Sequence, residues 1–594
     1  MNLTGGRNMK ITLIEPRAPG KHVYSNVNMP RLGLPILGTQ LKQAGHEVKL
    51  ILGSRRDIRL SDITRADLIC ISTTTSTVIE AYHLADFARD QGKPVIMGGA
   101  HVSFMAEEAL KHCDYVCRGE GDLTFIPLIS CIERGELPLD IPGLSFRRDG
   151  SIVHNPAADW VDMNRVPFPD LSLFTGLKMS TYPVMTSRGC PFDCTFCSVT
   201  QMFGHKYRCR ETSALLEELK QYRGKQVFFI DDNFAANPRR TKELLRAMIR
   251  DDVKPSWWCT QVRTDAARDD ELLQLMYDSN CRMVFVGMES VNPATLKSYN
   301  KKQEVEDIVY CVRRFHQLGI MVHGMFVFGA DEDSLQTIQE TLDFALKNRI
   351  DTVQFLILTP LPGTRTFAEL EREGRLLTRD WNLYDAHHVV FQPSQMSPYE
   401  LQKATIRAFK KFYGLSHIFS NLFMTGFRSL AFRALGCWMV RSWEKENRWY
   451  YRFLQVISNP QPAATWGSRI SKSIERFRLR KLKYICSEKF MEIEVAQEQG
   501  HYRVDLKGYL NDFSLAETFK TISGQIPRIY QNITINLDEV YFASEKTVIK
   551  FIDKLNELTS RARNIEVRVA PENKYLVQVL QKYDLKIPQF SISG

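Results

Sequence analysis

The sequence predicts an α/β protein of several domains, in which short buried strands alternate with helices along most of the chain. The 594 residues exceed what one hydrophobic core usually organises, and they correspond to about three or four domains. Hydrophobic residues make up 44% of the chain and charged residues 25%, which is the balance of a globular protein. Short β-branched runs recur with room for one helix between them, which is the pattern of a parallel sheet.

Residues 9–145 predict a doubly wound parallel sheet of the Rossmann type. The first strand is expected over 10–15, with helices over 33–44 and 77–91. Further strands are expected over 48–52, 68–72, 95–97 and 115–117. Sheets of this kind bind ligands at the carboxyl ends of their strands, so the loops that follow the strands are candidate binding segments. These loops are Ser72–Thr75, Gly98–His101 and Arg118–Gly121.

Residues 175–400 predict a second alternation, folded as an open, partial (β/α)6 barrel. A loop-rich linker with Pro156, Pro167 and Pro169 precedes it. Together with a strand just before Cys190, six strands are expected, which is too few for the eight of a closed barrel. The other five are expected over 227–230, 257–260, 283–286, 322–327 and 353–358, with helices such as 211–222 and 241–249 between them.

Residues 401–486 predict a helical and basic segment. Sixteen basic residues and three acidic ones lie between Arg407 and Lys483, a local charge of +13 against −3 for the rest of the chain. Apolar residues that share one helical face are Leu415, Ile418, Phe419, Leu422 and Phe423, and the aromatic residues that follow are Trp438, Trp443, Trp449, Tyr450 and Tyr451. Two interpretations are open: a helix that lies in a membrane interface, and a cap packed over the open barrel. Nucleic acid is not favoured, because no recognition motif accompanies the charge.

Residues 488–590 predict a small α/β domain. Strands are expected over 491–495, 502–506, 533–537 and 565–569, and helices over 515–522 and 546–563. The stretches Val504–Tyr509 and Ile535–Ser544 resemble those of STAS domains, a resemblance that implies a module for binding a protein partner. Ser544 falls where some STAS domains are phosphorylated, but Ala543 replaces the acidic residue usual before it, which argues against a phosphorylation switch.

The most specific motif is Cys190-Pro-Phe-Asp-Cys194-Thr-Phe-Cys197. It places three thiolates on one tight loop, as three irons of a cubic iron–sulfur cluster require. The alternatives are three unrelated buried thiols and a zinc site, for which Cys209 and His205 are the nearest further ligands. Because nothing nearby completes a zinc set at the usual spacing, we interpret Cys190, Cys194 and Cys197 as the ligands of a 4Fe–4S cluster.

The motif and the segments after it resemble the radical SAM (S-adenosylmethionine) superfamily. The resemblance implies that Phe229–Phe234 binds the SAM amino group through Asp231, Asp232 or Asn233, and that Arg263 contacts the SAM carboxylate. It also implies that Glu289, in Val286–Ser290, lies near the SAM ribose. Gly324, Gly329 and Leu361–Thr364 correspond to the strand ends that line the adenine pocket and the open mouth.

The first ~145 residues resemble the cobalamin-binding domain that precedes the radical SAM core in one large subfamily. The segments that carry this resemblance are Pro30–Leu37, Ala44–Val48, Met97–Val102 and Arg118–Gly121. The cobalamin contacts it implies are Ser72, Thr73, Thr74, Gly98, Gly99, His101, Gly119 and Glu120. The Asp-x-His-x2-Gly motif that supplies a cobalt-binding histidine elsewhere is absent, so no protein histidine is expected on cobalt. The alternative is a nucleotide-type domain without this cofactor.

The resemblance implies a class B methyltransferase that uses both cofactors. In such enzymes the reduced cluster cleaves SAM to a 5′-deoxyadenosyl radical, which removes hydrogen from an unactivated carbon, and methylcobalamin then delivers the methyl group. The basic aromatic segment favours a hydrophobic substrate such as a lipid, an isoprenoid or a tetrapyrrole. The alternatives are a cyclase or carbon–carbon coupling enzyme with the same cofactors, and a signalling protein that responds to cobalamin or redox state.

The amino-terminal residues Met1–Lys10 contain no apolar segment of the kind that directs export, and no apolar run approaches the ~20 residues of a membrane span. We therefore expect a cytoplasmic protein, peripheral to the inner membrane face at most, whose 13 cysteines are mostly reduced. A radical SAM enzyme also needs an electron donor, which would be a flavodoxin or a ferredoxin.

Overall fold

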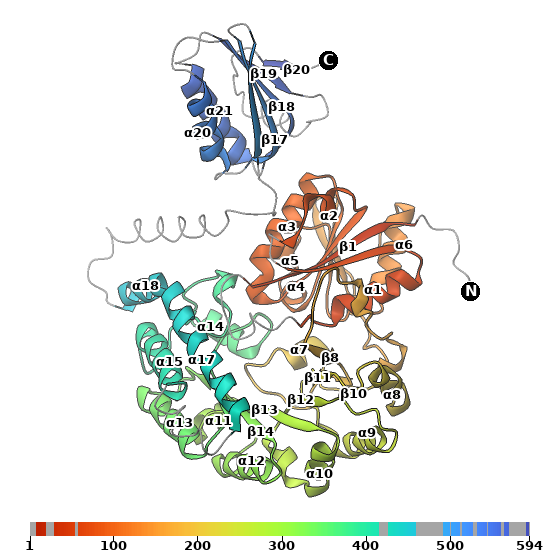
Figure 1. The fold of residues 1–594 in the computed structure, drawn as a ribbon, viewed down its shortest axis with the longest axis vertical. Coiled ribbons are helices and arrows are strands. Elements are labelled where there is room, and N and C mark those ends of the chain that lie inside the picture. The colour runs from red at the N-terminus through yellow and green to blue at the C-terminus, as the bar shows by residue number, and fades with distance from the viewer. Residues whose placement is uncertain are drawn as a thin grey trace. The chain divides into compact units, whose positions relative to one another are not determined.

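The computed structural model describes residues 8–18, 29–53, 57–414, 426–458, 491–498, 501–510, 514–526, 532–542, 545–559, 564–569 and 590–592. The chain divides into two compact units, shown with their elements in Figure 1. The first comprises Met1–Ser54, Arg65–Arg89 and Lys93–Ala463, and the second comprises Arg55–Thr64, Asp90–Gly92 and Ala464–Gly594.

The N-terminal sheet has the strand order β2-β1-β3-β4-β5-β6-β7. Its first five strands are parallel, as predicted: β1 (Lys10–Pro16), β2 (Glu47–Gly53), β3 (Leu68–Ser72), β4 (Val95–Gly98) and β5 (Tyr115–Cys117). The order 2-1-3-4-5 is that of flavodoxin-like sheets, whose ligand site lies where the order reverses, at β1 and β3. The core of this sheet includes Leu13, Leu50 and Ile96.

The sheet continues past residue 145, where the sequence analysis expected a linker. An antiparallel hairpin of β6 (Leu144–Arg148) and β7 (Ser151–His154) extends it beyond β5. Asp149 and Gly150 form its turn with φ values of 51° and 79°. Asp-Gly is a strong signal for a two-residue hairpin turn, and it was present in the sequence.

Helices connect these strands. They are α1 (Gly33–Gln43), α2 (Leu60–Thr64), α3 (Val78–Asp90), α4 (Ala100–Phe104), α5 (Ala106–Ala109) and α6 (Phe125–Arg134). α1 and α6 share one core with the sheet, through Leu34 and Leu41 of α1 and Leu128 of α6. The predicted βαβ pattern is therefore confirmed here.

The central sheet has six parallel strands in the order β15-β14-β13-β12-β11-β8. They are β8 (Thr181–Val184), β11 (Gln226–Phe229), β12 (Trp257–Val262), β13 (Cys281–Glu289), β14 (Met321–Phe328) and β15 (Thr352–Ile357). The intervening helices are α8 (Thr212–Lys220), α9 (Pro238–Arg250), α10 (Asp270–Asp278), α11 (Pro293–Ser298), α12 (Val305–Gln317) and α13 (Leu335–Lys347), and α14 (Arg365–Arg372) follows β15. Among the described residues β8 and β15 do not pair, so the sheet is open.

Two features position the cysteine motif. The short strands β9 (Ser187–Arg188) and β10 (Arg208–Cys209) pair antiparallel, and they enclose the motif and α7 (Val199–Phe203). Gly189 has a φ of 86°, and a Cβ added there would lie 2.4 Å from the carbonyl oxygen of Lys206. The chain therefore turns into the cysteine loop at a position that only glycine fits.

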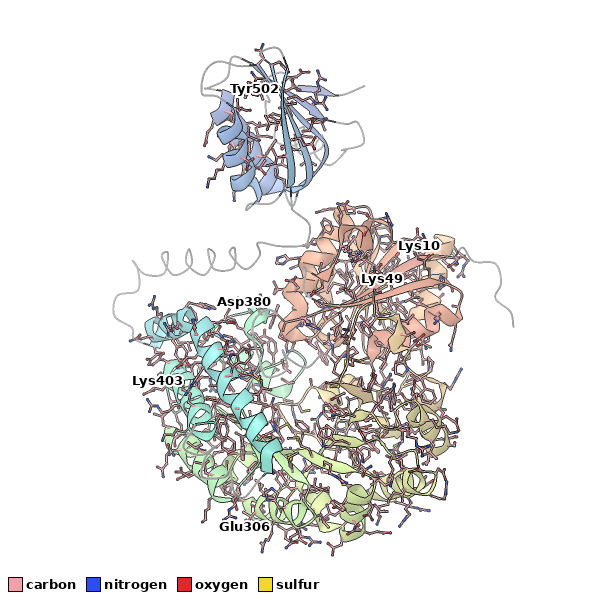
Figure 2. The ribbon with its side chains drawn as sticks, viewed as in Figure 1. Lys10, Lys49, Glu306, Asp380, Lys403 and Tyr502 are labelled. Carbon is pink, nitrogen blue, oxygen red and sulfur yellow. The ribbon has the colours of Figure 1, made fainter. Side chains whose placement is uncertain are left out.

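The helices described after α14 and before the C-terminal unit are α15 (Pro398–Phe412), α17 (Gly426–Glu446) and α18 (Arg448–Ser458). The Tyr413 hydroxyl accepts a hydrogen bond from the backbone nitrogen of Val353 (2.9 Å) and donates one to its carbonyl oxygen (2.7 Å), which fixes the end of α15 to β15. The exposed faces of the helices around the central sheet carry charged side chains, such as Glu306 on α12 and Lys403 on α15 (Figure 2). The predicted apolar face of Leu415, Ile418, Phe419, Leu422 and Phe423 lies outside the described residues.

Where the chain is described, none of its helices combines the length and the apolar character that a bilayer crossing requires.

The C-terminal unit contains a small α/β sheet with the order β16-β17-β18-β19-β20. Its strands are β16 (Met491–Glu498), β17 (His501–Leu510), β18 (Asn532–Phe542), β19 (Asn564–Val569) and β20 (Phe590–Ile592), and only β16 is antiparallel to its neighbour. Its helices are α20 (Ser514–Gln525) and α21 (Glu545–Thr559). The core gathers Val504, Ile535, Phe551 and Val567. Ala543 and Ser544 lie outside the described residues.

Candidate functional site

A cavity of about 420 Å³ lies where the carboxyl ends of both large sheets meet. The N-terminal sheet contributes the loops after β3, β4 and β5 and the start of α1, and the central part of the chain contributes Met185, Ser198, Ile230 and Asp232. Seven of the residues predicted to contact cobalamin line it: Ser72, Thr73, Thr74, Gly98, Gly99, Gly119 and Glu120. A further wall of the cavity is formed by residues between Arg31 and Leu37, just before and at the start of α1. These residues were not among the predicted cobalamin contacts.

Gly99 brings the loops after β3 and β4 into contact. Its φ is 96°, and an added Cβ would lie 2.3 Å from the carbonyl oxygen of Thr73. The Thr73 hydroxyl donates to the carbonyl oxygen of Gly98 (3.1 Å), and the hydroxyls of Thr74 and Thr77 lie 3.3 Å apart. These threonine hydroxyls therefore stabilise the loops that line the cavity.

His101 does not line the cavity, unlike the other residues predicted to contact cobalamin. Its side chain is buried, its ring lies 4.9 Å from that of Trp381, and its Nε2 is 3.5 Å from a carboxylate oxygen of Glu108. The same oxygen accepts hydrogen bonds from the Tyr82 hydroxyl (3.0 Å) and the Trp381 indole (2.9 Å). The helix N-terminus after Gly99 turns His101 inward, so its role is to pack the N-terminal sheet against the segment around residue 381.

Glu120 lines the cavity but is held in a buried charge network. Arg208 donates two hydrogen bonds to its carboxylate, of 2.9 and 2.6 Å. Arg188 lies 3.5 Å from the same carboxylate and donates two hydrogen bonds to Asp122, of 2.7 and 3.1 Å. Arg188 and Arg208 belong to the strands that enclose the cysteine motif, so the loop after β5 braces that motif directly.

The three cysteines of the motif lie on one half-buried loop. The backbone nitrogen of Thr195 donates to the carbonyl oxygen of Tyr299 (3.2 Å), and the Phe196 ring lies 4.8 Å from the Tyr299 ring. The Asp193 carbonyl accepts hydrogen bonds from Asn300 (2.8 Å) and Arg365 (2.7 Å). The segment after α11 and the start of α14 thus hold this loop in place.

Burial raises the pKa of the Cys190 and Cys197 thiols, that of Cys197 to about 12, because a thiolate is poorly solvated there. A bound metal reverses this preference, since a coordinated thiol is deprotonated. In the described part of the chain, no three His, Cys, Asp or Glu side chains converge on one point as a single metal ion requires. Thiolates that each bind a different iron need not converge, so this observation is compatible with a polynuclear cluster.

Of the residues predicted to bind the SAM amino group, Asp232 lines the cavity and Asn233 does not. Asp231 does not line it either. It is buried and accepts hydrogen bonds from the backbone nitrogen and hydroxyl of Thr186 (both 3.1 Å) and from the Ser187 hydroxyl. This network fixes the segment after β8 to the segment after β11, so Asp231 has a structural role, and its contact with SAM stays a prediction.

Asp232 and Asn233 remain as candidates. Asp232 lines the cavity, where the surrounding protein and then the charge of Asp231 raise its pKa to about 6. Asn233 is buried, and its Oδ1 atom has no hydrogen-bond partner in the structure. An unpaired buried acceptor is costly unless a ligand donates to it.

Two of the other predicted SAM residues adjoin the cysteine loop. The Arg263 guanidinium lies 3.7 Å from the centre of the Phe192 ring and donates to the carbonyl oxygen of Lys301. Glu289, with a φ of 61°, is buried in an ion pair with Lys301 (2.6 Å). A Cβ on Gly287 would lie 2.6 Å from the Glu289 carboxylate and 2.8 Å from the Lys301 nitrogen, so a larger residue there would displace the ends of these two side chains. Sequence reasoning missed Lys301.

Gly324 lies in close contact with the side chains around it. A Cβ there would lie 3.1 to 3.2 Å from side-chain atoms of Met288, Ile350 and Phe326. The close packing around β14 therefore explains this glycine, and its contact with SAM stays a prediction.

A second cavity of about 310 Å³ adjoins the first, and both are lined by Thr74, Ala100 and Ser198. Its other lining residues are Thr75, Ser76, Phe104, Thr359, Leu361, Pro362, Tyr384, Asp385 and Ala386. Phe104 packs on the turn after Leu361, where a Cβ on Gly363 would lie 2.4 Å from its ring. Burial raises the pKa of Asp385, but the charge and hydrogen bond of His388 outweigh this and lower it to about 2. The cavity therefore has mostly apolar walls, a rim of hydroxyls and one carboxylate.

The chain was compared with known protein families. Residues 24–129 match the B12 binding domain, and residues 184–345 match the Radical SAM superfamily. An uncharacterized methyltransferase of Pyrococcus horikoshii is 31% identical over 432 residues, which cover 68% of this chain and 92% of the relative. The bacteriochlorophyllide d C-12(1)-methyltransferase of Chlorobaculum tepidum is 29% identical, covering 70% and 89%. The hopanoid C-3 methylase of Methylococcus capsulatus is 26% identical, covering 76% and 90%.

Among solved structures, the radical SAM methyltransferase TsrM of Kitasatospora setae, with cobalamin and a [4Fe-4S] cluster bound, has a similar fold. The TM-score is 0.52 at 19% identity, over 62% of this chain and 75% of that chain. The methyltransferase of Pyrococcus horikoshii is matched over nearly its whole length. This chain belongs to the cobalamin-dependent radical SAM methyltransferases, which use a 4Fe–4S cluster, S-adenosylmethionine and cobalamin.

Proposed function

We propose that this chain methylates an unactivated carbon of a hydrophobic small molecule, with the 4Fe–4S cluster on Cys190, Cys194 and Cys197. The observation that carries the proposal is the junction of the two cavities at Thr74, Ala100 and Ser198. Ser198 directly follows the last motif cysteine, and Thr74 and Ala100 follow strands of the N-terminal sheet. A cofactor in the larger cavity, the cluster loop and a substrate in the smaller cavity would therefore meet at one point.

The residues present fit these groups. Three thiols on one braced loop form the donor set that a cluster with one open iron needs. The larger cavity has backbone rather than side chains at Gly98, Gly99 and Gly119, which leaves room for a bulky corrin to approach. The buried Oδ1 atom of Asn233 and the carboxylate of Asp232 would accept hydrogen bonds from the SAM ammonium group.

When bound, the reduced cluster supplies the electron that cleaves SAM, and cobalamin supplies the methyl group. The residues of the chain itself would position these groups and shield them from water. Arg263 stacks on Phe192, and Glu289 forms an ion pair with Lys301. These contacts would hold the charged side chains in fixed positions next to the proposed SAM site. Phe196 packs on Tyr299 and covers the cluster loop, which would limit access of water to the open iron.

The smaller cavity is the proposed substrate site. Phe104, Leu361, Pro362 and Tyr384 give it apolar walls, which suit a hydrophobic molecule. Two relatives carry names that specify such substrates, a bacteriochlorophyllide and a hopanoid. The Asp385 carboxylate, fixed by His388, would orient a hydroxyl or an amine of the substrate.

The C-terminal α/β unit is proposed to be an STAS-like module that binds a protein partner. Its mixed five-stranded sheet with two helices is complete in its own core, so it does not need the rest of the chain to bury its apolar side chains. A flavodoxin or ferredoxin would deliver electrons to the cluster.

The test is anaerobic reconstitution of the full chain with iron, sulfide and cobalamin, with Cys194→Ser compared against Cys209→Ser as the control. The wild type and C209S should bind four irons and one corrin, and C194S should lose the cluster but keep the corrin. Zinc in place of iron, or equal iron in both variants, would refute the assignment.

Product analysis separates methylation from the alternative chemistry. With a methylated product, S-adenosylhomocysteine and 5′-deoxyadenosine should form in equal amounts, since each transfer uses two SAM molecules. Formation of 5′-deoxyadenosine alone would indicate cyclisation or coupling instead.

A further inference from the structure

The helices α17 and α18, cyan in Figure 1, have a buried inner side and an exposed outer side. On the inner side, Trp443, Tyr450 and Leu454 are buried. On the outer side of α17, Trp438, Arg441 and Lys445 follow one another at helical spacing and are exposed. Trp438 is 52% exposed and Leu435, one turn before it, is 44% exposed. Large apolar side chains are thus presented next to cations.

The positive charge of this outer side is not neutralised by the described residues. Arg441, Lys445, Arg448 and Arg452 are all exposed, and none of them forms an ion pair with a residue that the structure describes. The nearest ion pair, between Lys410 and Glu444 (2.5 Å), uses one of the two acidic residues of these helices. The four cations therefore present a net positive surface, within the segment that holds the excess charge of the whole chain.

This combination fits an anionic lipid surface better than the alternatives. Basic side chains are attracted to anionic headgroups, while tryptophan and leucine gain by entering the boundary between headgroups and acyl chains. A nucleic acid would neutralise the cations but leave Leu435 in water. A crossing of the bilayer is not required, since none of the described helices is suited to one.

The inner side of the same helices supports the wall of the smaller cavity. Asn447, between α17 and α18, lies 3.2 Å from the Nε2 atom of His388 through its amide oxygen. The Nδ1 atom of His388 in turn lies 2.9 Å from the carboxylate of Asp385, which lines that cavity. The Tyr450 hydroxyl donates to the carbonyl oxygen of Val389 (2.5 Å). One layer of helices thus separates the outer surface from the cavity wall.

We propose that the outer side of α17 and α18 docks this protein on an anionic membrane surface. Arg441, Lys445, Arg448 and Arg452 bind lipid phosphates or carboxylates, and Trp438 and Leu435 insert at the headgroup boundary. Docking leaves the helices in the plane of the membrane, with their inner side still packed on the protein.

The test measures co-sedimentation of the full chain with vesicles of phosphatidylcholine alone and of phosphatidylcholine mixed with phosphatidylglycerol. The protein should bind only the anionic vesicles, and binding should weaken as salt is added. Arg441→Glu with Lys445→Glu should reduce the partition coefficient by about tenfold or more. The matched control, Arg313→Glu with Lys347→Glu, changes two exposed cations on α12 and α13 and should bind like the wild type.

The apolar residues of this surface, Leu435 and Trp438, are tested with a separate control. Leu435→Ala and Trp438→Ala should each weaken vesicle binding several-fold, whereas Leu335→Ala, equally exposed on α13, should not. Brominated lipids should quench the tryptophan fluorescence of the wild type more than that of W438F. Thermal unfolding midpoints equal to that of the wild type show that a variant is folded.

Equal binding to neutral vesicles, equal binding by R441E/K445E, or no binding to either vesicle overturns the proposal. Binding of a DNA or RNA oligonucleotide in place of the anionic vesicles, lost in the same variant, assigns this surface to nucleic acid and also overturns it.

Discussion

The carboxylate of Glu120 accepts two hydrogen bonds from the guanidinium of Arg208, 88 residues further along the chain. Glu120 lies in the loop after β5 of the N-terminal sheet, and Arg208 lies in β10, which closes the cysteine loop. Arg188 in β9 makes the equivalent pair with Asp122. The loop after β5, which lines the larger cavity, therefore also holds the two strands on either side of the cysteine loop.

Glu120→Ala should lower the free energy of unfolding by about 3 to 5 kcal/mol, because it leaves the buried Arg208 charge without its partner. Chemical denaturation of the full chain measures this. The control is Glu136→Ala, which removes a carboxylate paired with Arg134 on the surface and should change stability far less, because water solvates both charges. Equal effects of the two substitutions on the free energy of unfolding would contradict a stabilising role of the buried Glu120–Arg208 pair.

Glu218 on α8 predicts a pH dependence of stability. Its carboxylate is buried, and neither oxygen has a hydrogen-bond partner. Burial raises its pKa to about 7; the charge of Asp231 adds to this rise, and the charge of Arg210 opposes it. A carboxyl group whose pKa is higher in the folded state than in the unfolded state destabilises the fold when it ionises. Its full contribution to stability is present below the ordinary pKa of about 4.5 and is lost as the pH rises through about 7.

Glu218→Gln should therefore stabilise the protein at pH 8 by up to about 3 kcal/mol and have little effect near pH 4.5. Thermal unfolding at a series of pH values measures the difference. Glu217→Gln is the matched control, since Glu217 is exposed and pairs with Lys220 on the surface. A gain for E218Q that does not grow with pH would show that the carboxyl does not ionise in the folded protein.

The strands and helices of the fold could be predicted because their periodicity reports which side chains are buried. The predicted strand over 68–72 agrees with β3, and those over 257–260 and 322–327 lie inside β12 and β14. The segments of the site could also be located, since ligands bind at the carboxyl ends of parallel strands.

The roles of neighbouring residues within those segments could not be predicted. Asp231 and Asp232 are chemically identical in sequence, but the turn after β11 directs the first to Thr186 and the second to the cavity. His101 turns toward Trp381, which lies 280 positions away and gave no signal of contact. Such choices depend on tertiary packing between distant segments, which no local pattern encodes.

Tyr413→Phe should lower the free energy of unfolding by about 1 to 3 kcal/mol. It removes both hydrogen bonds to the backbone of Val353 and leaves two buried groups of β15 without a partner. Tyr310→Phe on α12 is the control, because Tyr310 is 39% exposed and water replaces any lost hydrogen bond. Denaturant titration compares the two, and an unchanged midpoint for Y413F would mean that α15 is held mainly by its apolar contacts.

Gly99→Ala should abolish cobalamin retention while iron content stays near that of the wild type. Two effects act at this position: strain from the positive φ of 96°, and collision of the new Cβ with the backbone of Thr73. Gly45→Ala separates them, because Gly45 has a φ of 94° but nothing within 4 Å of an added Cβ. Strain alone costs about 1 kcal/mol and should leave the cavity intact, so G45A should keep its corrin through gel filtration. Loss of corrin in both variants would assign the effect to general destabilisation, whereas loss in G99A alone places the corrin against the loops after β3 and β4.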